Sequence, residues 1–116
     1  MSLWKLYHNP KCSKSREALS FLEAQEVEFQ IVEYIKDPLS FEQLTEIAAQ
    51  LNGPVSSLVR ANEADFVNAP FDVNSVNEVA KALSEKPHLM ERPILQGKGM
   101  AVIGRPLENI QELLKR

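Results

Sequence analysis

Hydrophobic and polar positions along this chain of 116 residues form two kinds of segment, short apolar runs typical of strands and stripes with the period of a helix. Residues 3–8 (LWKLYH) and residues 27–34 are short segments rich in apolar, β-branched or aromatic side chains, which is typical of strands. Between them, residues 13–24 carry one apolar stripe at helical period. Because the connections are short, the order strand, helix, strand predicts a βαβ unit with parallel strands and a right-handed crossover.

The middle of the chain predicts three helical segments. Residues 40–51 open with SFEQ, the spacing of a capping box, and their apolar stripe ends at Gly53-Pro54. A connection is expected over 55–61 and a short helix over 62–68. A second capping box, SVNE at 75–78, opens a helix that stops before Pro87.

The last part of the chain predicts two strands and a helix. Apolar runs at 93–95 and 100–103 flank the segment QGKG, which is typical of a tight hairpin turn. Pro106 suits the first turn of a final helix with an apolar stripe. The whole order predicts an α/β fold with one four-stranded mixed sheet, βαβ followed by ββα, covered by helices.

Length and composition exclude several classes of protein. A chain of this length fits a single domain, 1–116, in which residues of about 38–90 form a helical insertion. With 16 acidic and 13 basic residues, the chain is not expected to have a surface that binds nucleic acid. We find no apolar run near the ~18 residues of a membrane span and no signal peptide, so we expect no membrane partner and a cytoplasmic location.

The single cysteine, Cys12, lies in the connection between the first strand and the first helix. One cysteine excludes an internal disulfide, and with only two histidines no metal site is expected. Unpaired N–H groups and the helix dipole stabilise a thiolate at this place, and Lys11 and Lys14 add positive charge. The alternative is a small buried apolar residue. The polar neighbours favour the reactive thiol.

Basic and titratable residues elsewhere suggest an anion site. Arg60, Arg92 and Arg105 lie in connections or at strand ends, two of them directly before a proline. Converging guanidinium groups would form a cradle for a tetrahedral oxyanion, whereas each arginine taken alone is better explained as an exposed surface residue. His8 either tunes the thiolate or packs at the strand end, and Arg16 lies one helical turn past the cysteine.

The segment from His8 to Arg16, HNPKCSKSR, resembles the active-site loop of the glutaredoxin-linked arsenate reductase family. That family has a Tyr-His-Asn-Pro approach to one catalytic cysteine, with Ser-Arg three and four residues beyond it. The segments around Arg60, Arg92-Pro93-Ile94 and Arg105-Pro106 resemble its three anion-binding arginines. The resemblance runs from residue 5 to residue 113 and implies a thioredoxin-like fold with a helical insertion and a cis bond at Arg92-Pro93.

The resemblance also implies a reaction. Arsenate would bind among Arg60, Arg92 and Arg105, and the Cys12 thiolate would form a covalent thio-arsenate adduct. No cofactor would be bound. Glutathione would be the external reductant, with glutaredoxin as protein partner, and the composition agrees because a lone cysteine cannot resolve the adduct internally.

Two departures and two alternatives accompany this interpretation. Ser13-Lys14 stands where the best-known reductases have Gly-Thr, and the chain ends at Arg116 without their longer tail, as expected for a short-chain branch. A sister group of redox-sensing regulators binds RNA polymerase and usually has a second cysteine at the place of Ser15. A non-enzymatic regulator or RNA-polymerase-binding adaptor is therefore one alternative. A generic glutathione-dependent thiol reductase is the other.

Overall fold

The computed structural model describes residues 4–115 and contains one mixed sheet. Its strand order is β2-β1-β3-β4; β1 pairs parallel with β2 and antiparallel with β3, and β3 pairs antiparallel with β4. The strands are Trp4–Tyr7 (β1), Phe29–Val32 (β2), Ile94–Gly97 (β3) and Met100–Ile103 (β4). The predicted four-stranded mixed sheet is confirmed, and Leu3 lies outside the described residues.

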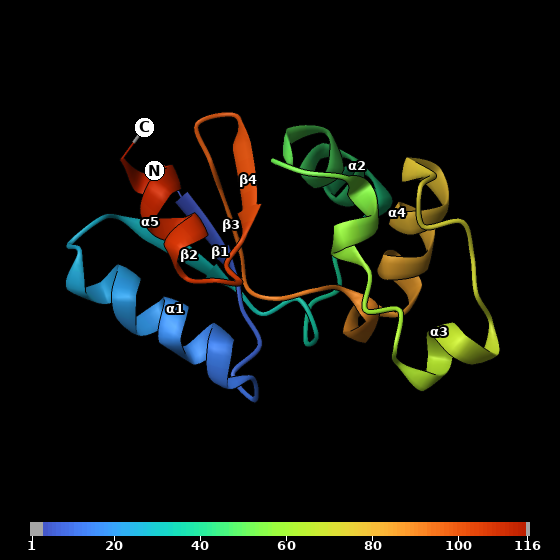
Figure 1. The fold of residues 1–116 in the computed structure, drawn as a ribbon. Helices are drawn as coiled ribbons and strands as arrows, with labels where there is room; N and C mark the ends of the chain where they lie inside the picture. Colours follow the sequence, from blue (N-terminus) through green and yellow to red (C-terminus); the bar gives the residue numbers. More distant parts are fainter. Residues whose placement is uncertain (1–3, 116) are drawn as a thin grey trace.

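Helices cover the sheet on both faces. Figure 1 shows α1 and α5 on one side of it, and the helices between β2 and β3 on the other. The helices are Ser13–Ala24 (α1), Phe41–Gln50 (α2), Val55–Leu58 (η1, 3-10), Ala64–Asn68 (α3), Val76–Glu85 (α4), Pro87–Leu89 (η2, 3-10) and Glu108–Leu114 (α5).

The sheet separates two hydrophobic cores because successive strand residues point to opposite faces. Leu6 and Leu95 face α1 and α5, where they pack with buried residues of those helices. Tyr7 and Ile94, their neighbours in sequence, face α2 and α4. This alternation fixes the strand register, since a slip of one residue would exchange the two cores.

Backbone bridges attach the helical half to the sheet half. The amide of Asn52 donates to the carbonyl of Ala101 at 2.9 Å. Farther along, Val59 and Met90 form an antiparallel bridge, in which Arg60 N donates to Leu89 O at 2.8 Å. This bridge places Arg60 beside the segment that leads into β3.

Several local predictions are confirmed. In the box at the start of α2, Ser40 Oγ accepts from Gln43 N at 3.1 Å, while Ser40 N donates to Gln43 Oε1 at 2.9 Å. Helix α1 has the predicted bounds. The Arg92-Pro93 bond is cis, as the family resemblance implied, and so is Arg105-Pro106.

Several predictions were wrong in detail, among them the second strand, which spans Phe29–Val32 instead of residues 27–34. The hairpin turn is two residues, Lys98-Gly99, both at positive φ, so Gln96 and Gly97 extend β3. The connection at 55–61 contains η1.

At α4 only half of the predicted box forms, because the Glu78 carboxylate accepts from Asp72 N instead of the amide of Ser75. Helix α5 begins at Glu108, so Pro106 precedes the helix. The carbonyl of Pro106 accepts from Asn109 N at 3.0 Å, which links the proline to the first turn of the helix.

Candidate active site

Cys12 is the N-cap residue of α1, at the end of the loop that follows β1. Its amide donates to Asn9 O at 3.0 Å, which closes the loop, and its carbonyl accepts the first helical bond from Arg16 N at 3.0 Å. The residue is 8% exposed. The thiol therefore lies at the amino end of the helix, as predicted, and is nearly covered by its surroundings.

The surroundings of the sulfur lower the pKa of Cys12 below its ordinary value. Burial is the largest effect and acts to raise the pKa, since it penalises the thiolate. The backbone N–H of Ser15, a hydrogen bond and the charge of Arg92, and the N–H of Lys14 act in the opposite direction and together outweigh burial. The site thus favours a nucleophilic thiolate.

Ser15 holds the loop that carries the cysteine. Its side chain is fully buried, and Oγ accepts from Asn9 N at 3.0 Å and lies 2.6 Å from His8 Nδ1. Burial is the main cause that lowers the pKa of His8, so the imidazole is neutral at pH 7 and its Nδ1 can accept the serine proton. Ser15 thus connects the imidazole of His8 to the loop that carries Cys12.

Arg16 contacts the same loop from outside. Its Nη1 donates to Pro10 O at 2.8 Å, and the side chain is exposed. The guanidinium therefore braces the loop and adds positive charge near His8.

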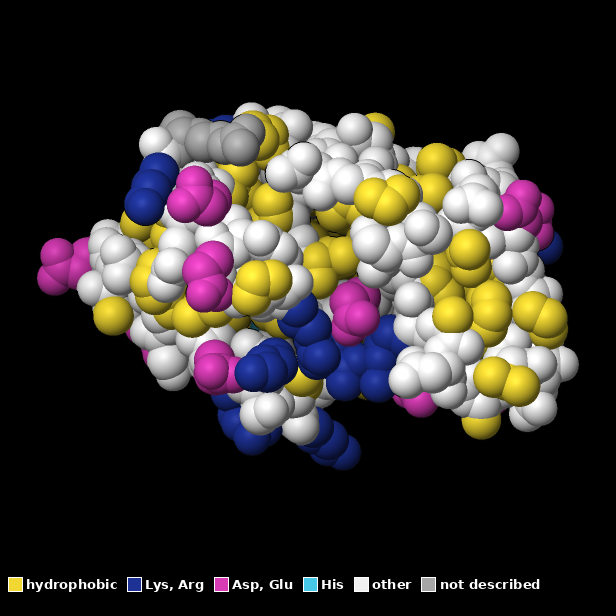
Figure 2. All heavy atoms as spheres, viewed as in Figure 1, with side chains coloured by type: hydrophobic (Ala, Val, Ile, Leu, Met, Phe, Trp, Pro, Cys, Tyr) yellow, Lys and Arg dark blue, Asp and Glu magenta, His cyan; other side chains and the backbone are white. Residues whose placement is uncertain are grey.

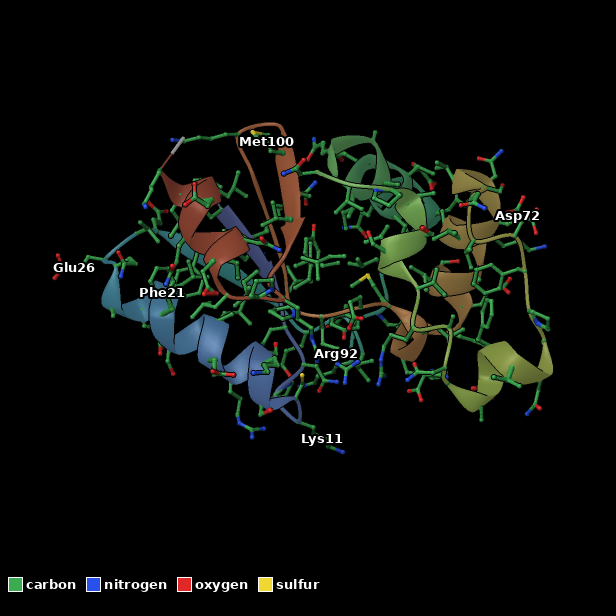
Figure 3. All side chains as sticks on the ribbon, viewed as in Figure 1. Lys11, Phe21, Glu26, Asp72, Arg92 and Met100 are labelled. Atoms are coloured by element: carbon green, nitrogen blue, oxygen red, sulfur yellow. The ribbon has the colours of Figure 1, made fainter. Side chains whose placement is uncertain are left out.

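Arg105 and Arg92 meet at the sulfur of Cys12. Arg105 Nη2 lies 3.2 Å from Cys12 Sγ, and its Nε donates to Arg92 O at 2.7 Å. Arg92, labelled in Figure 3 between the two halves of the molecule, gives the sulfur a second side-chain hydrogen bond. Its side chain is 15% exposed, and its buried Nε has no hydrogen-bond partner within residues 4–115. The fold thus brings two of the three predicted arginines to the cysteine.

Arg60 has other partners. Its Nη1 donates to Glu63 Oε1 at 2.7 Å and to His88 O at 3.2 Å. The charges of Arg60 and of Cys12 both act on the hydroxyl of Tyr34, so this hydroxyl is within electrostatic range of both residues.

Two residues of the site were not predicted from the sequence. Tyr34 is 1% exposed, and burial raises its pKa to about 12, with further effects from Arg92 and Cys12. Glu91 lies next to both guanidinium groups. The segment containing Glu91 carried the family resemblance, but nothing in its spacing indicated a role for the carboxylate. Tyr34 gave no signal beyond that of a strand.

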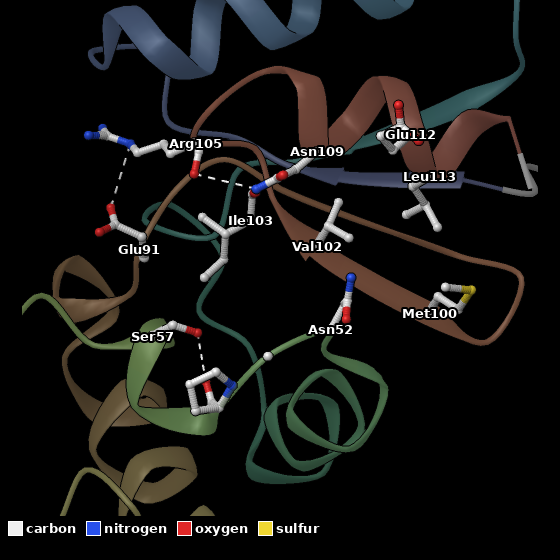
Figure 4. A pocket seen from close by; sticks show the side chains of 12 residues that line it. Asn52, Ser57, Glu91, Met100, Val102, Ile103, Arg105, Asn109, Glu112 and Leu113 are labelled. Carbon is white, nitrogen blue, oxygen red and sulfur yellow. Dashed lines mark hydrogen bonds and ion pairs between the residues drawn. The ribbon is translucent and has the colours of Figure 1, made fainter.

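The surface around the site is basic and hollowed. Lys and Arg side chains gather in Figure 2 where the two halves of the molecule meet. Glu91 and Arg105 line one end of a cavity of about 500 Å³ between β4, α5 and the segment 52–57 (Figure 4). Within residues 4–115 there is no cluster of three or more His, Cys, Asp or Glu that could hold a metal ion. In the same range, no helix has the length and apolar character needed to cross a bilayer.

Comparison with protein families identifies this arrangement. The family model described as the ArsC family matches residues 7–113. The chain belongs to the ArsC family. An arsenate reductase of Neisseria meningitidis is 35% identical over 113 residues, which cover 95% of this chain and 97% of the relative. The solved structure of an arsenate reductase from Vibrio cholerae is 36% identical, with a TM-score of 0.85 over 97% of this chain and 98% of that one.

The ArsC matches also include a regulator. A global transcriptional regulator, Spx, of Lactiplantibacillus plantarum is 26% identical over 113 residues, covering 96% of this chain and 86% of the relative. The predicted thioredoxin-like fold is confirmed by the structural match to ArsC reductases. The relatives of this chain therefore include both arsenate reductases and a transcriptional regulator.

Proposed function

We propose that the chain is an arsenate reductase of the glutaredoxin-linked type, which reduces arsenate to arsenite with Cys12 as nucleophile. The observation that carries the proposal is the position of the Cys12 sulfur between helix N–H groups and the guanidinium groups of Arg92 and Arg105. Such a site stabilises a thiolate and can bind an oxyanion beside it. Membership of the ArsC family and the named relatives support this substrate.

The first step forms the adduct. The Cys12 thiolate attacks arsenic, an As–S bond forms and one As–O bond breaks. The leaving oxygen of hydrogen arsenate takes one proton and departs as water, which leaves a thio-arsenate on the cysteine. Arg92 and Arg105 stabilise the negative charge that collects on the remaining oxygens.

The second step supplies the electrons. Reduction of As(V) to As(III) needs two electrons, which come from converting two thiols into one disulfide. Cys12 provides one thiol, and the other must come from outside because the chain has a single cysteine. We assign this role to glutathione: the As–S bond breaks, arsenite leaves and a Cys12–glutathione disulfide remains. Glutaredoxin, the protein partner, uses a further thiol to reduce this disulfide and returns Cys12 to the thiol, so no resident cofactor is required. The cytoplasm, where thiols stay reduced, is the location we propose.

The other residues of the site have supporting roles in this proposal. Arg92 and Arg105 bind the oxyanion directly, and Arg60 contributes the third, outer positive charge. His8 and Arg16 hold the loop that presents the sulfur, through Ser15 and through the carbonyl of Pro10.

A coupled assay tests the proposal. Arsenate, glutathione and glutaredoxin are supplied together with glutathione reductase and NADPH, and NADPH oxidation is followed by absorbance. Arsenate-dependent turnover by the wild type that is lost in Cys12→Ser supports the proposal. Equal turnover by Cys12→Ser, or none by the wild type, contradicts it.

The match to the regulator Spx favours a second candidate, a non-enzymatic protein that docks on RNA polymerase. Retention of RNA polymerase on the immobilised protein, combined with no arsenate turnover, would support that candidate. Glutathione-dependent turnover of a disulfide substrate without arsenate turnover would instead support the generic thiol reductase.

A further inference from the structure

Glu91 places a carboxylate against both arginines of the site. Its Oε1 lies 3.7 Å from Arg92 Nη1 and 3.7 Å from Arg105 Nε, and the same atom accepts from Arg92 N at 3.2 Å. The backbone fixes this position, because Glu91 N donates to Leu58 O at 2.7 Å beside the Val59–Met90 bridge. One carboxylate oxygen therefore faces two guanidinium groups at once.

The contact attracts the arginines without using their donors. A separation of 3.7 Å is an ion pair and lies beyond hydrogen-bond length. Within the described residues, the buried Nε of Arg92 has no hydrogen-bond partner, and Nη2 of Arg105 lies on the Cys12 sulfur. Glu91 therefore acts on the side chains of both arginines through charge, while the hydrogen bonds of Arg105 go to Arg92 O and the Cys12 sulfur and the N–H of Arg92 Nε stays available to an incoming oxyanion.

Among the groups that contact the sulfur or its two arginines, the charges balance only because Glu91 is present. Cys12 as thiolate and Glu91 carry two negative charges, which equal the two positive charges of Arg92 and Arg105. Arg60 is already paired with Glu63 at 2.7 Å. Removing the charge of Glu91 would leave one net positive charge and a stronger attraction for any tetrahedral anion, including phosphate and sulfate, which share the shape of arsenate.

We propose that Glu91 is a positioning residue that holds Arg92 and Arg105 in the free protein and keeps the affinity of the site for tetrahedral oxyanions low. An unreactive anion must displace the carboxylate and then binds weakly. Arsenate displaces it as well, but is retained by its covalent bond to Cys12. This inference rests on the proposed anion site and makes Glu91 a determinant of its selectivity.

The cavity beside the pair gives the displaced carboxylate a place to go. Glu91 and Arg105 lie at one end of this space of about 500 Å³, and Figure 4 shows their ion pair at its edge. Glu112 lines the same cavity with its carboxylate near Lys115 instead of the arginines. Glu112→Gln is therefore a matched control for Glu91→Gln, since both remove one negative charge from one cavity.

The test measures anion binding without requiring turnover. Iodoacetamide alkylates Cys12, and inorganic phosphate or sulfate protects the sulfur in proportion to its occupancy of the site. Rates are corrected for the thiolate titration of each variant, and thermal melts verify folding. In Glu91→Gln we expect the apparent phosphate dissociation constant to fall about tenfold. In Glu112→Gln and in the charge-conserving Glu91→Asp, this constant should stay near the wild-type value. The arsenate KM should fall in parallel, without a rise in kcat.

The outcomes separate this inference from the proposed function. Unchanged or weaker phosphate protection in Glu91→Gln, or equal effects of Glu91→Gln and Glu112→Gln, overturns the role of Glu91. Tighter phosphate binding together with no arsenate turnover by any variant supports the role of Glu91 and contradicts the reductase.

Discussion

Nη2 of Arg105 lies 3.2 Å from Sγ of Cys12, although the two residues are 93 positions apart in the chain. The contact depends on the pairing of the segments that enter β3 and leave β4. Gly104 N donates to Pro93 O at 2.8 Å, and Arg105 Nε donates to Arg92 O at 2.7 Å. The same backbone contacts that close the sheet therefore also set the position of the guanidinium group.

The first prediction concerns the shape of that group. Arg105→Lys keeps the positive charge but loses the planar pair of donors, one of which reaches the sulfur and the other Arg92 O. We expect kcat/KM for arsenate to fall about tenfold to a thousandfold, as is typical when charge-assisted contacts to a reacting anion are lost. Steady-state kinetics measure this effect, and Arg92→Lys should behave in the same way.

Arg16→Lys is the control for these variants, because its guanidinium binds the Pro10 carbonyl and donates no bond to Cys12. Melting temperatures should change little in Arg105→Lys, since this side chain is 37% exposed. If Arg105→Lys and Arg16→Lys reduce kcat/KM equally, the contact with the sulfur has no catalytic importance.

The second prediction concerns the ionisation of Cys12. Its lowered pKa means that the thiolate absorbance should titrate below the range of a free thiol. A depressed pKa in the folded state stabilises the protein above the unfolded-state pKa, and this contribution is lost as the pH falls through the folded-state pKa.

Thermal melts of the wild type and Cys12→Ser across a pH series measure the linkage. The advantage of the wild type should grow as the pH rises and become constant above the pKa of a free thiol. An advantage that shrinks over this range would show that burial, which raises the pKa, outweighs the hydrogen bonds.

The third prediction concerns Gly104, which packs against Pro93 and α5. A Cβ at this position would lie 2.6 Å from Ile110 Cδ1, closer than carbon atoms approach, and 3.0 Å from Pro93 Cγ, tighter than most such contacts, so both side chains would have to shift. Gly104→Ala should therefore destabilise the fold by about 1–3 kcal/mol and displace Arg105. Denaturant unfolding and arsenate kcat/KM measure the two effects, and the compensating pair Gly104→Ala with Ile110→Val should recover part of both. Full stability in Gly104→Ala would contradict this packing argument.

The fourth prediction concerns the hydroxyl of Tyr34. Because the pKa of Tyr34 is raised to about 12, the phenol keeps its proton at every pH used for assays and can donate to an anion among the arginines. Tyr34→Phe should raise the arsenate KM about threefold to tenfold, the range of one neutral hydrogen bond. The shape of the pH profile should stay the same. A shifted profile would indicate that the phenol titrates during the reaction.

Local signals in the sequence were sufficient for much of the fold. The box at Ser40 and Gln43 and the apolar stripe of α1 depend on neighbouring residues, so each could be recognised without the rest of the chain. The hairpin was placed correctly but its length was wrong, because Gln96 and Gly97 look like turn residues until β1 provides a partner for them. The single-domain organisation with an insertion over about 38–90 stays a prediction.

The site was less accessible to sequence reasoning. Cys12 was recognised because its loop and helix are contiguous, and the arginines because of the prolines beside them and the family resemblance. Contacts between distant segments decide the rest: Arg60 is paired with Glu63, and Tyr34 and Glu91 reach the site only through the packing of the two halves. Charge partners that meet only after folding leave no pattern in the chain.

The most direct test of the account is the mass of the protein after exposure to arsenate without any thiol. Because the chain has one cysteine, the first step should proceed and the second should not. We predict a rapidly quenched intact mass with one arsenic adduct, located by proteolysis to the peptide that contains Cys12, and discharged as arsenite when glutathione and glutaredoxin are added. A wild-type protein that turns over arsenate with no such adduct, or an adduct that persists in Cys12→Ser, would contradict the account.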